Sequence, residues 1–263
     1  MTLDLSLKGK HALITGASAG IGRAAALELA ALGADITVLA RRQDALEALA
    51  GELEIAGAGA TRAIACNLED ARMLRSSVEQ LLTTSGPVHV LINNAGGPPG
   101  GPILEASGED FLTAMRRHLL ASHLLVQLVT PGMQSAGFGR IINIISTSVR
   151  EPIPGLGVSN TTRGAMAAWA KSLSKELPPG ITINNVLPGF TDTERLTALA
   201  RTNAERSGRT PEQVREAWLA TVPEGRLGQP GELGAVIAFL ASPAASFVRG
   251  VSIPVDGGRL NGI

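Results

Sequence analysis

The chain has 263 residues with 23 basic and 23 acidic side chains, so its formal net charge is zero and no run of like charges occurs. This balance argues against nucleic acid or an anionic membrane as a partner. The single cysteine, Cys66, excludes an internal disulfide framework and is typical of a small buried residue in a reducing compartment. The amino terminus lacks a signal-peptide pattern and Pro, Gly and Asn interrupt the apolar stretches, so we expect a cytoplasmic protein without a membrane span.

Short strand-like runs alternate along the chain with longer Ala- and Leu-rich stretches. Several runs are apolar without alternation, as expected of strands covered on both faces. The repeated β-α order predicts a single doubly wound, Rossmann-type α/β domain over residues 1–263, with about seven parallel strands and helices on both faces. The predicted strands are His11 to Thr15, Asp35 to Ala40, Thr61 to Ala65, His89 to Asn93, Arg140 to Ile145, Ile181 to Leu187 and Val251 to Val255. The predicted helices lie near 20–32, 43–56, 70–84, 109–130, 160–177 and 231–241.

Residues 191–229 interrupt this alternation where a lid over the strand ends would lie. Within them, Thr210 can cap a helix, Pro211 suits its first position and Gln213 completes a capping box. The segment carries several arginines, which suggest an anionic or acyl-carrier substrate. The plainer alternative, which we favour, is a solvated helix face. The arginines are Arg195, Arg201, Arg206, Arg209 and Arg215, and their candidate partners are Glu194, Glu205, Glu212 and Glu216.

A glycine-rich turn, TGASAGIG, follows the first predicted strand and opens the first predicted helix. Glycines such as Gly16, Gly20 and Gly22 let the backbone turn tightly and approach a pyrophosphate. A helix N-terminus adds free N–H groups and the positive end of its dipole. A glycine triplet alone is a weak signal, but its position between strand and helix indicates dinucleotide binding.

The same motif resembles the short-chain dehydrogenase/reductase family. NNAG at 93–96, PG at 188–189, RLGQPGEL at 226–233 and VDGG at 255–258 follow in the family's order, over almost the whole chain. The phrases NNAGGPPGGP and INNVLPGFTDTERL are loosely similar to β-ketoacyl-carrier-protein reductases within it. The resemblance implies a homotetramer with a small-molecule substrate. It also implies pyrophosphate contacts from Ser18, Gly20, Ile21 and Gly22, ribose contacts from Asn94, Ala95 and Gly96, and nicotinamide contacts from Pro188, Gly189, Thr191 and Thr193.

The choice of cofactor depends on the end of the second predicted strand. An acidic residue there would bind both ribose hydroxyls and repel a 2′-phosphate. Arg41 and Arg42 stand there instead and favour NADP(H) over NAD(H), although one arginine could simply begin the next helix in solvent. After the third strand, Asn67 replaces the acidic residue that the family places against the adenine, and its amide can still form hydrogen bonds.

The resemblance also implies a catalytic serine and a Tyr-x-x-x-Lys pair, and this chain departs from that pattern. Ser146 stands at the serine position, but the chain has no tyrosine, and Ser159 and Arg163 occupy the positions of the pair. Residues four apart share one helix face. A serine hydroxyl is a far weaker acid than a phenol, whose reference pKa is about 10. Arginine cannot pass a proton, but its fork can hold ribose hydroxyls, a carboxylate or a phosphate.

His118 aligns with the asparagine that the family uses in its proton relay. Histidine titrates near neutral pH and could supply the missing proton transfer, with a structural role as an equal alternative. Two interpretations remain, and we assign no metal ligand in either. The favoured one is an NADP(H)-dependent oxidoreductase for a small carbonyl or alcohol, using Ser146, Ser159 and Arg163 with His118 or water. The other is an NADP(H)-binding protein without ordinary dehydrogenase activity, either a regulatory binder or a non-redox enzyme.

Overall fold

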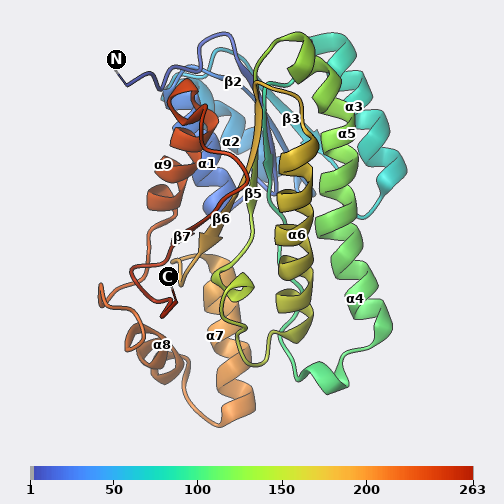
Figure 1. The fold of residues 1–263 in the computed structure, drawn as a ribbon. Coiled ribbons are helices and arrows are strands. Elements are labelled where there is room, and N and C mark those ends of the chain that lie inside the picture. The colour runs from blue at the N-terminus through green and yellow to red at the C-terminus, as the bar shows by residue number, and fades with distance from the viewer. Residues whose placement is uncertain (1–2, 263) are drawn as a thin grey trace.

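A seven-stranded parallel sheet forms the centre of the computed structural model, which describes residues 3–262 (Figure 1). The strand order is β3-β2-β1-β4-β5-β6-β7, and every neighbouring pair is parallel. Each predicted strand is confirmed to within one residue at either end. The strands are β1 (His11–Thr15), β2 (Asp35–Ala40), β3 (Thr61–Ala65), β4 (Val90–Asn93), β5 (Gly139–Ile144), β6 (Ile181–Pro188) and β7 (Ser252–Val255).

Helices cover both faces of this sheet (Figure 1). One face packs against α1 (Gly20–Ala31), α2 (Gln43–Ala56) and α9 (Pro230–Ala241), the other against α3 (Ala71–Ser85), α5 (Ala121–Ser135) and α6 (Gly157–Glu176). Successive side chains of β1 alternate between the two layers: Ala12 and Ile14 join the first core and Leu13 joins the second. Burial on both sides explains why several strands, such as β1, β2 and β4, consist mainly of apolar residues. Among residues 3–262, no helix has both the length and the apolarity that a membrane span requires.

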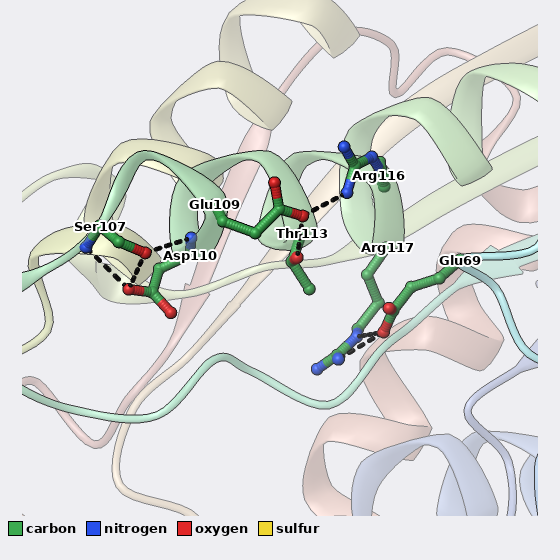
Figure 2. Close-up of polar contacts among 7 residues, drawn as sticks. All are labelled: Glu69, Ser107, Glu109, Asp110, Thr113, Arg116 and Arg117. Atoms are coloured by element: carbon green, nitrogen blue, oxygen red, sulfur yellow. Dashed lines mark hydrogen bonds and ion pairs between the residues drawn. The ribbon is translucent and has the colours of Figure 1, made fainter.

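The long helix predicted at 109–130 is instead three segments. Residues Gly108–Met115 form α4, Arg116–Leu120 form a π-helical turn, and α5 follows directly. A π turn inserts one residue into the helical repeat and therefore redirects the side chains around it. In Figure 2 the two neighbouring arginines of this turn point to different partners: Arg116 is directed to Glu109 on α4, whereas Arg117 reaches Glu69 beyond β3.

Residues 191–229 contain two helices at the carboxyl ends of the strands (Figure 1). The predicted helix start is confirmed, because the Thr210 hydroxyl accepts a hydrogen bond from the Gln213 backbone N–H at 3.2 Å and begins α8 (Pro211–Leu219). The helix α7 (Glu194–Ser207) was not predicted. A lid function for this segment stays a prediction. Short 3₁₀ turns also occur at Ile103–Glu105, Thr147–Val149 and Pro243–Ala245.

A row of buried amides ties together the strands that approach the site. Asn93 donates to the Asn143 carbonyl oxygen at 2.8 Å, and Asn143 donates to that of Asn185 at 2.9 Å. Asn185 in turn donates to the Ser252 hydroxyl at 3.0 Å. The strand register places these residues side by side on β4, β5, β6 and β7. Because a buried amide without partners is costly, this row fixes the register of the sheet.

Candidate active site

A cavity of about 590 Å³ extends along the carboxyl ends of the strands, from the glycine turn to α7 and α8. Its size is ordinary for a cofactor or ligand site. It is lined by every residue that the sequence assigned to the site except Gly22 and His118. These are Gly16, Ser18, Gly20, Ile21, Arg41, Arg42, Asn67, Asn94, Ala95, Gly96, Ser146, Ser159, Arg163, Pro188, Gly189, Thr191 and Thr193.

The glycine turn depends on the absence of side chains. Gly16 and Gly20 have φ values of +59° and +56°, which favour glycine. A Cβ on Gly22 would lie 2.5 Å from both the Asn94 Nδ2 and the Gly16 carbonyl oxygen, which are hydrogen-bonded to each other at 3.0 Å. The Thr15 hydroxyl fixes the Asn94 backbone, because it donates to the Asn94 carbonyl oxygen at 2.8 Å and accepts from the Asn94 N–H at 2.9 Å. Gly22 therefore shapes the turn without lining the cavity, and the turn leaves a cradle that fits a dinucleotide pyrophosphate.

Two arginines line the cavity close to the glycine turn. Arg41 and Arg42 are exposed, and both line the cavity. Arg42 Nη2 lies 3.4 Å from the Ser18 hydroxyl, so its guanidinium reaches back over the glycine turn. Asn67 uses its side-chain oxygen to accept the Glu69 backbone N–H at 3.2 Å, which leaves its NH₂ group available. Positive charge beside a hydroxyl that lines the cavity suits a phosphate group.

Ser146, Ser159 and Arg163 all line this cavity. Ser146 caps the turn after β5, accepting a hydrogen bond from the Ser148 backbone N–H at 3.0 Å. Ser159 lies near the start of α6, and Arg163 follows one turn later. Arg163 is only 8% exposed and donates to the Ile144 carbonyl oxygen at 2.9 Å. Burial, reinforced by the positive charge of Arg195, lowers the pKa of Arg163 to about 10, so it stays protonated at neutral pH.

His118 does not line the main cavity. It is 3% exposed and lines a separate space of about 10 Å³ with Asn93 and Arg163. Three buried atoms around this space, His118 Nε2, Arg163 Nε and Asn93 Oδ1, have no hydrogen-bond partner among residues 3–262. The space is close to the volume of one water molecule.

The electrostatics of His118 also bear on its predicted role. Burial and the charges of Arg163 and Arg117 hold its pKa well below the usual range. The imidazole is therefore neutral at pH 7. A neutral side chain outside the main cavity is not placed to protonate a substrate there directly, so a part for His118 in proton transfer stays a prediction.

The cavity is also lined by arginines that the sequence did not assign to the catalytic site. Arg117 is ion-paired with Glu69, at 2.8 Å from Nε (Figure 2). Arg195 donates from Nη2 to the Pro98 carbonyl oxygen at 2.6 Å. Of the five arginines predicted in residues 191–229, this one alone reaches the cavity. Arg215 lies 3.7 Å from Asp192, while Arg201, Arg206 and Arg209 are exposed on or beyond α7.

Two stacked aromatic rings form part of the cavity wall. The rings of Phe190 and Trp218 are stacked with centroids 5.0 Å apart, and the Arg259 guanidinium lies 4.8 Å from the centre of the Phe190 ring. Arg259 also donates to the Thr147 hydroxyl at 3.2 Å. Together, the ring stack, the cation–π contact and the hydrogen bond connect α8 and the C-terminal segment to the turn after Ser146.

Comparisons with known proteins agree with this geometry. A family model described as enoyl-(acyl carrier protein) reductase matches residues 16–259. A 3-oxoacyl-(acyl-carrier-protein) reductase from Pseudomonas aeruginosa is 34% identical over 260 residues, spanning 97% of this chain and 98% of that relative. The crystal structure of L-sorbose reductase from Gluconobacter frateurii with NADPH and L-sorbose superposes with a TM-score of 0.92 at 29% identity, covering 99% and 100% of the two chains. An NAD⁺-bound xylitol dehydrogenase reaches 0.90 at 27% identity, covering 96% and 99%.

Proposed function

Because the chain belongs to the short-chain dehydrogenase/reductase family, we propose that it is an NADP(H)-dependent oxidoreductase for a small carbonyl or alcohol substrate. One observation carries the proposal. A single cavity connects the glycine turn with Ser146, Ser159 and Arg163, so a cofactor cradle and a polar reaction site share one space. When bound, the nicotinamide dinucleotide supplies or accepts the hydride.

The preference for NADP(H) rests on this chain's own residues. Solved relatives hold NADPH in one case and NAD⁺ in another, so the family alone does not select the cofactor. Arg41 and Arg42 line the cavity beside Ser18, where they would bind a 2′-phosphate through charge-assisted hydrogen bonds. No acidic residue at the end of β2 competes for the ribose hydroxyls.

At the substrate end, the hydroxyls of Ser146 and Ser159 hydrogen-bond the reacting oxygen. The charge of Arg163 favours the negative charge that develops there, an effect that is strong in a site with little water. No tyrosine, lysine or histidine is present among the described residues that line the cavity. In this proposal, the proton on the product oxygen is therefore exchanged with solvent water.

The second candidate is an NADP(H)-binding protein without ordinary dehydrogenase activity. The observation that favours it is the missing acid: the chain has no tyrosine, and burial keeps His118 neutral. Positioned acid–base groups typically contribute about 10²–10⁴ in rate, so their loss is severe.

The two candidates separate in one assay. The purified protein is mixed with NADPH and either acetoacetate, methyl acetoacetate or small neutral ketones, and consumption of NADPH is followed. We expect turnover of at least one carbonyl, and we expect Ser146→Ala to lower kcat by about a hundredfold, as removal of an oxyanion donor does. Binding of NADPH without turnover of any of them would favour the second candidate.

We also propose that the protein is a cytoplasmic homotetramer in which residues 191–229 act as a lid. The resemblance to the family supports the assembly, and the position of α7 and α8 over the cavity supports the lid. Light scattering in solution gives the mass of the assembly directly.

A further inference from the structure

Two guanidinium groups meet on one side of the Gly97 backbone. A Cβ built on Gly97 would lie 3.4 Å from Arg195 Nη2 and 3.8 Å from Arg163 Nη2. One side chain comes from α6 and the other from α7, and all three residues line the main cavity. Two positive charges are therefore presented to the same part of the cavity.

Neither guanidinium has a carboxylate partner within residues 3–262. The hydrogen bonds of Arg163 and Arg195 go to backbone carbonyls, those of Ile144 and Pro98. Glu194 also lines the cavity, but it forms no ion pair with either arginine in the described part of the chain. The neighbouring Arg117 already pairs with Glu69.

Leaving this charge unpaired is costly, most of all for Arg163. That side chain is 8% exposed, and its hydrogen bond goes to an uncharged group, the Ile144 carbonyl. Buried charges in proteins are normally paired or hydrogen-bonded. The partial burial of Arg195, together with the charge of Arg117, lowers the pKa of Arg195, which is the response expected of crowded cations. The arrangement therefore suits an anion.

We propose that Arg163 and Arg195 form a binding site for the carboxylate of a short oxo acid or hydroxy acid. The inference rests on the proposed function, because it names the substrate class of the same site. A planar carboxylate fits the fork of a guanidinium, and two forks can share it. The pair carries two positive charges, so one bound carboxylate leaves one charge to stabilise negative charge on the reacting oxygen.

The helix geometry brings a hydroxyl and this charge to the same substrate. Ser159 and Arg163 are four residues apart on one face of α6, and both line the main cavity. A carbonyl that binds at Ser159 and a carboxylate that binds between Arg163 and Arg195 can therefore belong to one small molecule. The proposed substrates are short 2-oxo and 3-oxo acids and the corresponding hydroxy acids.

Calorimetric titration of the NADP⁺-saturated protein tests this site without turnover. Acetoacetate is the probe, and methyl acetoacetate is its neutral counterpart with the same carbonyl. We expect acetoacetate to bind at least tenfold more tightly than the ester, and Arg195→Gln to weaken acetoacetate by about tenfold to a hundredfold, the usual range for a hydrogen bond to a charged group.

Two further variants make the test specific. Arg201→Gln removes the same charge from the same helix at an exposed position that does not line the cavity, and it should leave the acetoacetate affinity within about twofold. Gly97→Ala keeps both charges but puts a methyl group between them and should also weaken acetoacetate. Thermal unfolding confirms that each variant is folded.

Several results would overturn the proposal. Equal affinities for acid and ester, or equal effects of Arg195→Gln and Arg201→Gln, would mean that the pair does not bind the carboxylate. Sulfate that binds as tightly as acetoacetate, with the same dependence on Arg195, would mean a general anion site rather than an oxo-acid site. Acetoacetate binding without any carbonyl turnover would support this site while removing the oxidoreductase assignment, so the two failures are distinguishable.

Discussion

The two ends of the cavity are built from different parts of the chain. The cofactor end consists mainly of backbone, shaped by Gly16, Gly20 and Gly22 and held by Asn94. The substrate end consists of side chains, with Ser159 and Arg163 on one face of α6 and Arg195 reaching in from α7. A backbone cradle accepts few substitutions, whereas a side-chain site changes its chemistry when one residue is exchanged.

This difference explains how one chain can keep the family's cofactor motif and depart from its catalytic pattern. Replacing side chains at positions 159 and 163 leaves the course of α6 intact, since serine and arginine are both tolerated in a helix. Replacing a glycine of the turn would move the backbone itself.

The largest effect is expected from Gly22→Ala. Its Cβ would lie 2.5 Å from two atoms that are hydrogen-bonded to each other, so the glycine turn has to move. We expect roughly 2–3 kcal/mol of lost stability and a loss of about a hundredfold in NADPH affinity. Gly51→Ala is the control, because a Cβ there meets nothing within 4 Å and should not weaken binding. Unchanged affinity in Gly22→Ala would mean that the turn is not the cradle.

The second prediction is that His11 makes the stability of the fold depend on pH. His11 lies at the start of β1, away from the glycine turn. His11 is buried, its Nε2 is 2.8 Å from the Thr37 hydroxyl, and burial lowers its pKa to about 4. The folded-state pKa is below the unfolded value, so the unfolded chain binds the proton more readily. The stability this provides is complete above about pH 6.5 and is lost as the pH falls towards 4.

Urea unfolding at pH 7 and pH 5 measures this contribution. We expect the free energy of unfolding to fall by about 2 kcal/mol over that interval on account of His11, and His11→Gln to show a correspondingly smaller fall. If both proteins lose the same stability, His11 is not the titrating group. Because this site lies in the scaffold, NADPH affinity at pH 7 should differ little between the two.

A smaller effect is expected at the 2′-phosphate position. In the double variant Arg41→Ala with Arg42→Ala, NADPH should lose about tenfold in affinity, while NADH should change little. Fluorescence titration of both cofactors measures the ratio. Equal affinities for NADPH and NADH in the unmodified protein would refute the assignment of NADP(H).

Most of the fold follows from local sequence. The strands are confirmed to within one residue because most of them are short, largely apolar runs bounded by turns, and all but the edge strands β3 and β7 are almost fully buried. The start of α8 was predictable from Thr210 and Gln213, because a capping box is a local sequence signal. The helix α7 carries only Leu196, Ala200 and Ala204 as buried residues, which is too weak an apolar stripe to predict. The π turn at Arg116–Leu120 has no sequence signature at all.

The site was predictable where it depends on motifs and not where it depends on distant contacts. The glycine turn was found from its spacing and its place between strand and helix, and Asn94 from the resemblance to the family. The approach of Arg195 to Arg163 depends on where α7 passes, and the contact of Arg259 with Thr147 spans 112 residues of chain. The row of Asn93, Asn143 and Asn185 likewise appears only when the strand register is known.

The central claim is that positions 159 and 163 form a changed site rather than a damaged one. The most direct measurement is NADPH oxidation by the double variant Ser159→Tyr with Arg163→Lys, assayed on small neutral ketones and on acetoacetate. The account predicts no gain on neutral ketones and a loss of the activity and binding that the unmodified protein has towards acetoacetate. A gain of roughly two to four orders of magnitude on ketones, the range that acid–base catalysis supplies, with nothing lost on acetoacetate, would contradict it.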